Sequence, residues 1–157
     1  MRPRRARYWF SPILTIVSAL GCGERATPVR FELFEAQSAP AAGLTSISDP
    51  ATGKSFYLPA VPIISNSDVR SAYTDLDQFG NPAVQLYLNA KGAQAMTTAT
   101  RPYEERPIVL VVLVNSKLQL SYDVKTTISD MVMIPGKFSG AEAKAVAEGI
   151  MSWNTSP

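Results

Sequence analysis

Alternating apolar and polar residues along most of the chain predict a protein built largely from short strands. Four segments alternate as expected of strands with one buried face: residues 30–36, 72–78, 83–88 and 118–124. Residues 108–114 (IVLVVLV) are apolar throughout, which predicts a strand buried on both faces in the middle of a sheet. The segment 128–134 (ISDMVMI) is interpreted as a further strand, and residues 61–64 as a short one.

Turn-forming residues separate these strands into hairpins. Asp49, Pro50 and Gly53 predict the turn of a hairpin over 45–59, because Asp-Pro initiates turns and glycine accepts a positive φ. Residues 79–82 (FGNP) predict the turn that reverses the chain between the strands at 72–78 and 83–88. Ahead of these strands, residues 65–72 predict a turn or a single helical turn.

Two helices are predicted from their caps. Asn89 is a typical N-cap, and Pro102 ends the helix that Asn89 begins. The buried face of this helix should comprise Ala93, Met96 and Thr100. Ser139 and Glu142 form a capping box directly after Phe138. The second helix should bury Ala143, Val146, Ala147 and Ile150. The predicted fold class is α+β, a mostly antiparallel sheet of hairpins with two helices packed on one face.

The first 21 residues are typical of an export signal. Four arginines precede an apolar run of 13 residues, which is shorter than the ~20 residues of a membrane span. The sequence ALGC follows, and Cys22 is the only cysteine in the chain. We expect cleavage before Cys22 and lipidation of its thiol, as in bacterial lipoproteins. An ordinary signal peptide or an uncleaved anchor is the alternative.

These patterns divide the chain into four parts: a lipoprotein-type signal peptide (1–21), a tether (22–29), one domain (30–153) and a tail (154–157). Acyl chains on Cys22 would anchor the domain to the membrane on the periplasmic side of the cell envelope. Gly23 stands where an aspartate typically retains lipoproteins in the inner membrane, so the outer membrane is favoured.

Removing the leader reverses the sign of the net charge. The chain has 15 basic and 13 acidic residues, and without the four arginines of the leader the net charge becomes −2. No cluster of Lys or Arg remains to neutralise phosphates, so nucleic-acid binding is not expected. The chain contains no histidine, which removes the commonest general base and metal ligand. We expect no cofactor.

Asp75 and Asp77 are the strongest candidates for chemistry. Two residues apart on a strand, they would share a face at about 6–7 Å, as a carboxylate pair or two calcium ligands. The calcium-loop pattern is not completed, because Phe79 occupies its third ligand position. The other interpretation is a solvated strand face beside a turn, which we favour, so the protein is not expected to be an enzyme.

The segment 68–96 resembles the head of the first periplasmic domain (the P1 head) of the SecD and SecDF protein-export membrane proteins. The matching positions there are Asp68, Val69, Ala72, Asp77, Gly80, Pro82, Val84, Leu88, Gly92 and Ala93. A second segment matches through Ile134, Gly136, Phe138, Glu142 and Ala143. The resemblance covers about residues 30–152 and implies structural roles: a turn at Gly80-Asn81-Pro82, and a helix at Gly92 packed close to a strand.

The resemblance carries over no catalytic residue. In the family, the head is thought to contact exported polypeptides or to move against a base subdomain, and membrane helices that use a proton gradient follow. The resemblance therefore implies a non-enzymatic domain that binds protein or peptide, with export or envelope assembly as its setting. The alternatives are a structural envelope lipoprotein, a small-ligand-binding module, or an enzyme that uses Asp75 and Asp77.

Overall fold

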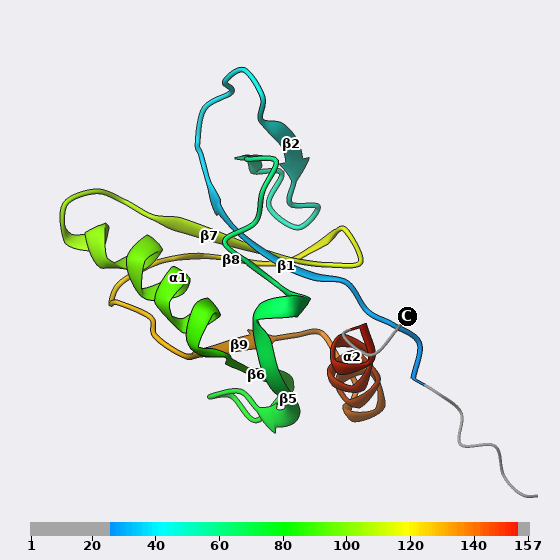
Figure 1. Ribbon diagram of the computed structural model, residues 1–157. Coiled ribbons are helices and arrows are strands. Elements are labelled where there is room, and N and C mark those ends of the chain that lie inside the picture. The colour runs from blue at the N-terminus through cyan, green and yellow to red at the C-terminus, as the bar shows by residue number, and fades with distance from the viewer. Residues whose placement is uncertain (1–25, 154–157) are drawn as a thin grey trace, which may run out of the picture.

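The computed structural model describes residues 26–153 (Figure 1). Its strands are β1 (Phe31–Ala36), β2 (Thr45–Ser48), β3 (Ser55–Leu58), β4 (Ile64–Ser65), β5 (Val69–Leu76), β6 (Pro82–Leu88), β7 (Val109–Val114), β8 (Lys117–Asp123) and β9 (Met131–Pro135). Its α-helices are α1 (Ala90–Thr100) and α2 (Gly140–Trp153), and its 3-10 helices are η1 (Asn66–Asp68) and η2 (Arg101–Glu104). The leader, Cys22 and the tail from residue 154 lie outside the described residues.

The strands form three antiparallel sheets, where the sequence predicted one. Four strands pair in the order β4-β1-β7-β8, three in the order β5-β6-β9, and β2 pairs with β3. The α+β class and the two helices are confirmed. Within the described residues, β8 and β9 are edge strands of different sheets.

Strand β7 is buried on both faces, as its unbroken apolar sequence predicted. Leu110 and Val112 point into the main core, which lies between the two larger sheets and the helices. Val111 and Leu113 point the other way, into a smaller core with Phe56. Each such side chain contributes about 1.5–3 kcal/mol by burial. Strand β7 therefore supports both cores, as does its neighbour β1 through Leu33 and Phe34.

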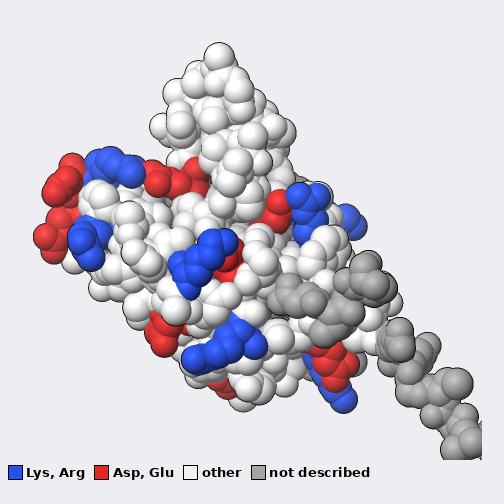
Figure 2. Space-filling view, in the orientation of Figure 1, with Lys and Arg blue, Asp and Glu red and all other residues white. Residues whose placement is uncertain are grey.

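The hairpin β2–β3 covers the second core. It stands above the four-stranded sheet in Figure 1, and Phe56 and Leu58 are its buried residues. In Figure 2 the lobe formed by this hairpin and the connection before it shows no charged side chain on the visible face, whereas the rest of that face mixes basic and acidic residues. Phe56 and Leu58 of the hairpin cover the outer face of β1 and β7.

Both helices bury most of the faces that their spacing predicted. In α2, Ala143, Ala147 and Ile150 are buried in the main core, Val146 is half-buried against it, and the helix packs on β5 and β6. In α1, Met96 and Thr100 are buried, while Ala93 is half-buried. The predicted N-cap is confirmed, since the Asn89 side chain accepts a hydrogen bond from the backbone N–H of Gly92 at 3.0 Å.

Three strands differ from the predicted bounds: the short strand predicted at 61–64 is β4 (Ile64–Ser65), and β5 and β9 are displaced along the chain. Strand β9 begins at Met131, and the backbone of Ile128 is bound to α1 instead: its N–H donates to Thr100 Oγ1 at 2.9 Å, while the Thr100 hydroxyl donates to the Met96 carbonyl at 2.8 Å. Strand β5 begins at Val69, directly after η1, with an irregular pairing between Val69 and Ser71. Neither a side chain that binds the backbone nor an irregularity in strand pairing can be recognised from the alternation of apolar and polar residues.

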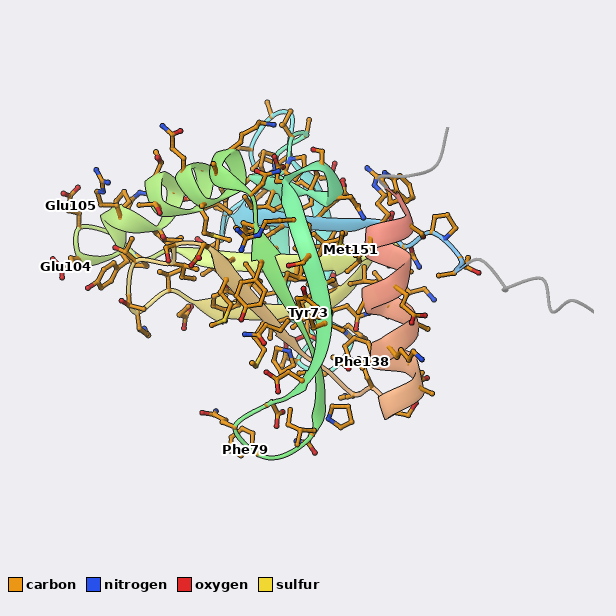
Figure 3. The ribbon with its side chains drawn as sticks, turned by 60° about the horizontal axis from the view of Figure 1, so that its bottom comes forward. Tyr73, Phe79, Glu104, Glu105, Phe138 and Met151 are labelled. Carbon is orange, nitrogen blue, oxygen red and sulfur yellow. The ribbon has the colours of Figure 1, made fainter. Side chains whose placement is uncertain are left out.

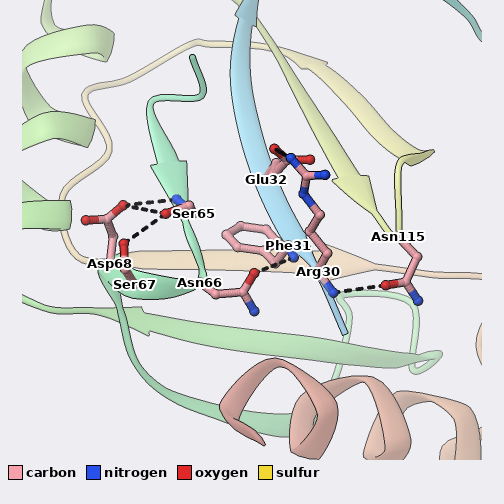
Figure 4. A network of polar contacts seen from close by, with 8 residues as sticks. All are labelled: Arg30, Phe31, Glu32, Ser65, Asn66, Ser67, Asp68 and Asn115. Carbon is pink, nitrogen blue, oxygen red and sulfur yellow. Dashed lines mark hydrogen bonds and ion pairs between the residues drawn. The ribbon is translucent and has the colours of Figure 1, made fainter. Parts of the chain in front are cut away.

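Asn66 joins three distant segments through its buried side chain (Figure 4). Its Oδ1 accepts from the backbone N–H of Phe31 at 2.7 Å. Its Nδ2 donates to the carbonyls of Val29 and Ile150, at 2.8 and 3.2 Å. The beginning of β1, the connection before β5 and the end of α2 are therefore held together by one amide, which the sequence did not indicate.

Gly92 packs against η1 as well as against the end of strand β6. A Cβ at this position would lie 2.8 Å from the carbonyl oxygen of Asp68, and only then 3.3 Å from Cβ of Leu88 in β6. The Asp68 carbonyl also accepts from the N–H of Asn89 at 2.8 Å, which fixes its position. This contact requires a residue without a side chain.

Gly92→Ala is expected to destabilise the protein. Alanine normally stabilises a helix by up to about 1 kcal/mol relative to glycine, but the added methyl group must displace backbone at Asp68. We expect a net loss of about 1–3 kcal/mol, measured by urea unfolding. Gly140→Ala is the matched control, because a Cβ there meets no atom within 4 Å. Equal stability of both variants and the parent would contradict this packing.

The Glu142→Gln variant is expected to lose less free energy of unfolding than the parent protein as the pH falls. In the capping box, the Ser139 N–H donates to Glu142 Oε2 at 2.7 Å, and bonds from Ser139 lower the pKa of Glu142 below its usual 4.5. The charged form stabilises the fold above the unfolded-state pKa, and this contribution is lost as pH falls through the lower folded-state pKa. Urea unfolding between about pH 5 and pH 3 measures the effect. If the free energy of unfolding falls equally with pH in the variant and the parent, this contribution of Glu142 is excluded.

Candidate functional site

A groove opens where the two larger sheets leave strand edges unpaired. It has a volume of about 630 Å³, within the usual ~300–1,000 Å³ of ligand sites. Its walls come from β8, β9 and the connection between them, with the β5–β6 turn at one end. The apolar lining residues are Phe79, Leu120, Tyr122, Ile128, Met131, Val132, Met133 and Pro135.

The floor of the groove is formed by residues at the boundary of the main core. Leu120, Tyr122 and Ile128 pack against buried core residues yet also line the groove. Burial raises the pKa of Tyr122 to about 12, so its hydroxyl stays neutral at physiological pH. The groove is therefore a place where the core is not closed, and it offers an apolar surface to an entering molecule.

The rim of the groove carries exposed apolar side chains. Met131 is 43% exposed and Phe79 is 79% exposed. Figure 3 shows Phe79 at the tip of the β5–β6 hairpin, away from the body of the domain. On the outer face of the same sheet, Tyr73 and Tyr87 stack edge to face with ring centroids 6.2 Å apart. Clustered exposed apolar groups of this kind mark interaction sites, and methionine adapts to varied partners.

The charge of the groove is acidic. Asp77 and Asp130 line it, and no Lys or Arg does among the described residues. Asp77 accepts from the backbone N–H groups of Asn81 and Phe79, at 2.9 and 2.8 Å, and these bonds lower its pKa. Asp77 therefore stays ionised and holds the turn at the end of the groove.

A second hollow of about 530 Å³ adjoins the first along β8. The two share Asp77, Leu120 and Pro135, and the second adds residues of the β2–β3 turn and Lys137. The accessible surface therefore continues along the edge of the four-stranded sheet, where its charge becomes mixed.

Asp75 and Asp77 occupy different surroundings. Asp75 lies in β5, and its Oδ1 accepts from the N–H of Leu76 at 2.8 Å. Asp77 lies after the end of β5, in the turn that its carboxylate holds. Among residues 26–153, no group of three or more His, Cys, Asp or Glu side chains is arranged to hold a metal ion.

Most positions shared with the export family lie in the scaffold. Gly80 has φ +81°, Pro82 begins β6, and Val84 and Leu88 are buried in the main core. Asp68 caps η1, with its Oδ2 accepting from the N–H of Ser65 at 3.0 Å (Figure 4). At Gly136 a Cβ would overlap the ring of Phe138, which packs on the core. The capping box of Glu142 is confirmed.

The groove residues themselves were not predicted from the sequence. Met131, Met133 and Tyr122 were assigned to strands with no indication that these strands would be edges. The one available signal was Phe79, a large apolar residue inside a turn of Asp, Gln, Gly and Asn. A turn has no packing need for such a side chain.

No helix among the described residues has the length and apolar character needed to cross a membrane. The family model described as SecDF, P1 head subdomain, matches residues 43–152, most of the chain. The protein translocase subunit SecD of Aquifex aeolicus (strain VF5) is 27% identical over 92 residues. That match covers 59% of this chain but only 18% of the relative, so the chain corresponds to a small part of it.

Two solved structures share the fold. SecDF in its super-membrane-facing form superposes with a TM-score of 0.61 at 18% identity, covering 81% of this chain and 19% of that one. A structure of SecDF, described as a membrane component that enhances protein export, gives a TM-score of 0.61 at 16% identity, covering 81% and 64%. With the family model, these matches confirm the resemblance inferred from the sequence. The chain belongs to the SecDF P1 head subdomain family.

Proposed function

We propose that this chain is a non-enzymatic domain that binds segments of unfolded polypeptide on the extracytoplasmic side of the membrane and contributes to protein export. The observation that carries the proposal is the apolar groove between the edge strands β8 and β9, with methionines and Phe79 on its rim. A solved relative is described as enhancing protein export, which supports the same setting.

The groove is suited to binding and offers little for catalysis. Its two carboxylates come from Asp77 and Asp130, and Asp77 is already occupied by the N–H groups of its own turn. The Tyr122 hydroxyl is held neutral by burial. Gln78 and the hydroxyls of Thr126, Thr127 and Ser129 line the rest of the polar surface, and the part of the chain that the structure describes places no lysine or histidine in the lining to act as a base. We infer that the groove holds its ligand without reacting with it.

A lipid anchor on Cys22 completes the proposal. The leader of residues 1–21 and the small residues before Cys22 support cleavage and acylation, and Gly23 supports sorting to the outer membrane. Val29 is held to α2 through its N–H and the Gly149 carbonyl at 2.9 Å, so the folded domain begins within a few residues of the anchor. The domain would therefore remain close to the membrane surface.

Substituting the rim of the groove should weaken binding of unfolded polypeptide. Met131→Asp and Phe79→Asp place charge where the groove presents apolar surface, and both side chains are exposed enough to be changed without unfolding the protein. With the full chain in detergent and a fluorescent, permanently unfolded polypeptide as probe, anisotropy should show affinity at least about tenfold lower, or ~1.4 kcal/mol. Val61→Asp is the control, since Val61 is 75% exposed and does not line the groove.

Equal affinity in all variants, or no saturable binding by the parent, would contradict the proposal. A small-ligand module is the second candidate, because the volume of the groove also suits an organic molecule. In that case a metabolite would raise the midpoint of thermal unfolding while the unfolded polypeptide would not bind.

A further inference from the structure

We propose that the bound polypeptide segment pairs with the open edge of β9 as an added strand, the fourth of the β5-β6-β9 sheet. This inference rests on the proposed function and specifies how the groove recognises its ligand. In this mode the backbone of the ligand supplies hydrogen bonds and its side chains supply selectivity.

The hydrogen-bond pattern identifies which groups of β9 are open. The Leu88 N–H donates to the Asp130 carbonyl at 2.8 Å, so these residues form a hydrogen-bonded pair of the antiparallel ladder. Such pairs alternate along the strand, and therefore Val132 and Ile134 also point their backbone groups toward β6. The N–H and C=O groups of Met131 and Met133 point outward. They have no backbone partner beyond the sheet among the described residues.

The groove is lined by consecutive residues of β9 and by alternate residues of β8. Met131, Val132 and Met133 line it, and because the Val132 side chain is buried in the main core, the edge of the strand and the two methionine side chains face the groove. From β8, Leu120 and Tyr122 line the same groove, whereas consecutive residues 118–121 line the adjoining hollow. Within the groove, an entering strand would therefore meet the backbone of β9 and the side chains of Leu120 and Tyr122.

Strand β9 is also the more regular of the two edges. Its pairing with β6 runs without interruption from Met131 to Pro135. The pairing of β8 with β7 shifts register between Val112 and Leu113, and irregularities of this kind protect an edge from further pairing. Pro135 lacks an N–H, so it ends the open edge and confines ordered pairing to Met131 and Met133.

The charge of the groove indicates which side chains the added strand carries. The groove contains Asp77 and Asp130 and no basic lining residue, so it favours segments with Lys or Arg over acidic ones. The apolar floor of Leu120 and Tyr122 accepts apolar side chains, which in a strand project at alternate positions. The ligand is therefore an extended segment with alternating apolar residues and a flanking basic residue.

N-methylated peptides test the pairing directly. Two versions of one such peptide are compared with the unmodified form, each methylated at one of the two alternating sets of residues, with the full chain in detergent. Because a strand pairs with one neighbour through alternate residues, methylation of one set should lower the affinity at least tenfold and methylation of the other less than about twofold. If both sets weaken binding equally, or neither does, the added strand is excluded while the proposed function stands. If the unmodified peptide does not bind, the proposed function itself fails.

Met133→Pro is the corresponding change in the protein. Proline removes the outward N–H of Met133 and leaves the pairs with β6 intact, a position in which edge strands tolerate proline. Peptide affinity should fall at least tenfold, while Met133→Ala, which keeps the N–H, should lose less than about threefold. Circular dichroism and urea unfolding report whether Met133→Pro folds; if it does not, the methylated peptides decide. Equal affinity of the folded proline variant and the alanine variant would overturn the proposal, as would a β9-to-β9 dimer that excludes the peptide.

Discussion

The proposed binding function depends on the open backbone groups along the edge of β9. The two larger sheets share one core through β7 and the helices, yet β8 and β9 do not pair, and the core remains accessible between them. The connection that joins these strands is bound to α1 instead. The Ile128 N–H donates to Thr100 Oγ1 at 2.9 Å, so the chain contacts the helix before β9 begins.

The remaining polar contacts of the core keep the two sheets in fixed relation. Asn66 binds the beginning of β1 and the end of α2, and in β1 the buried Glu32 forms an ion pair with Arg30 at 2.7 Å (Figure 4). Buried polar groups of this kind cost free energy unless they are paired, so they restrict the fold to the arrangement that satisfies them. A groove on a rigid support loses little entropy on binding, which suits a site that must accept varied segments.

The sequence predicted the elements better than their assembly. The unbroken apolar run of β7, the Asn89 cap and the Ser139–Glu142 box are local signals, and each is confirmed. The division into three sheets was not predicted, because periodicity gives the buried face of a strand and not its neighbours. For the same reason Met131 and Met133 were read as ordinary strand residues. Asp77 was a candidate for chemistry because of its carboxylate. In the structure this carboxylate accepts hydrogen bonds from the N–H groups of Phe79 and Asn81 and stabilises a turn. Hydrogen bonds between residues distant in sequence, such as those from Asn66 to Val29 and Ile150, leave no recognisable pattern in the sequence.

Membership of the SecDF P1 head subdomain family gives the fold a setting, and the open edge of β9 gives it a mode of action that depends on backbone groups. Hydrogen exchange in the free protein tests this most directly. The account predicts that the amides of Met131 and Met133 exchange rapidly, while those of Val132 and Ile134, which point toward β6, are protected with the core. Similar strong protection of all four amides in the free protein would show that the edge is already paired and would contradict the account.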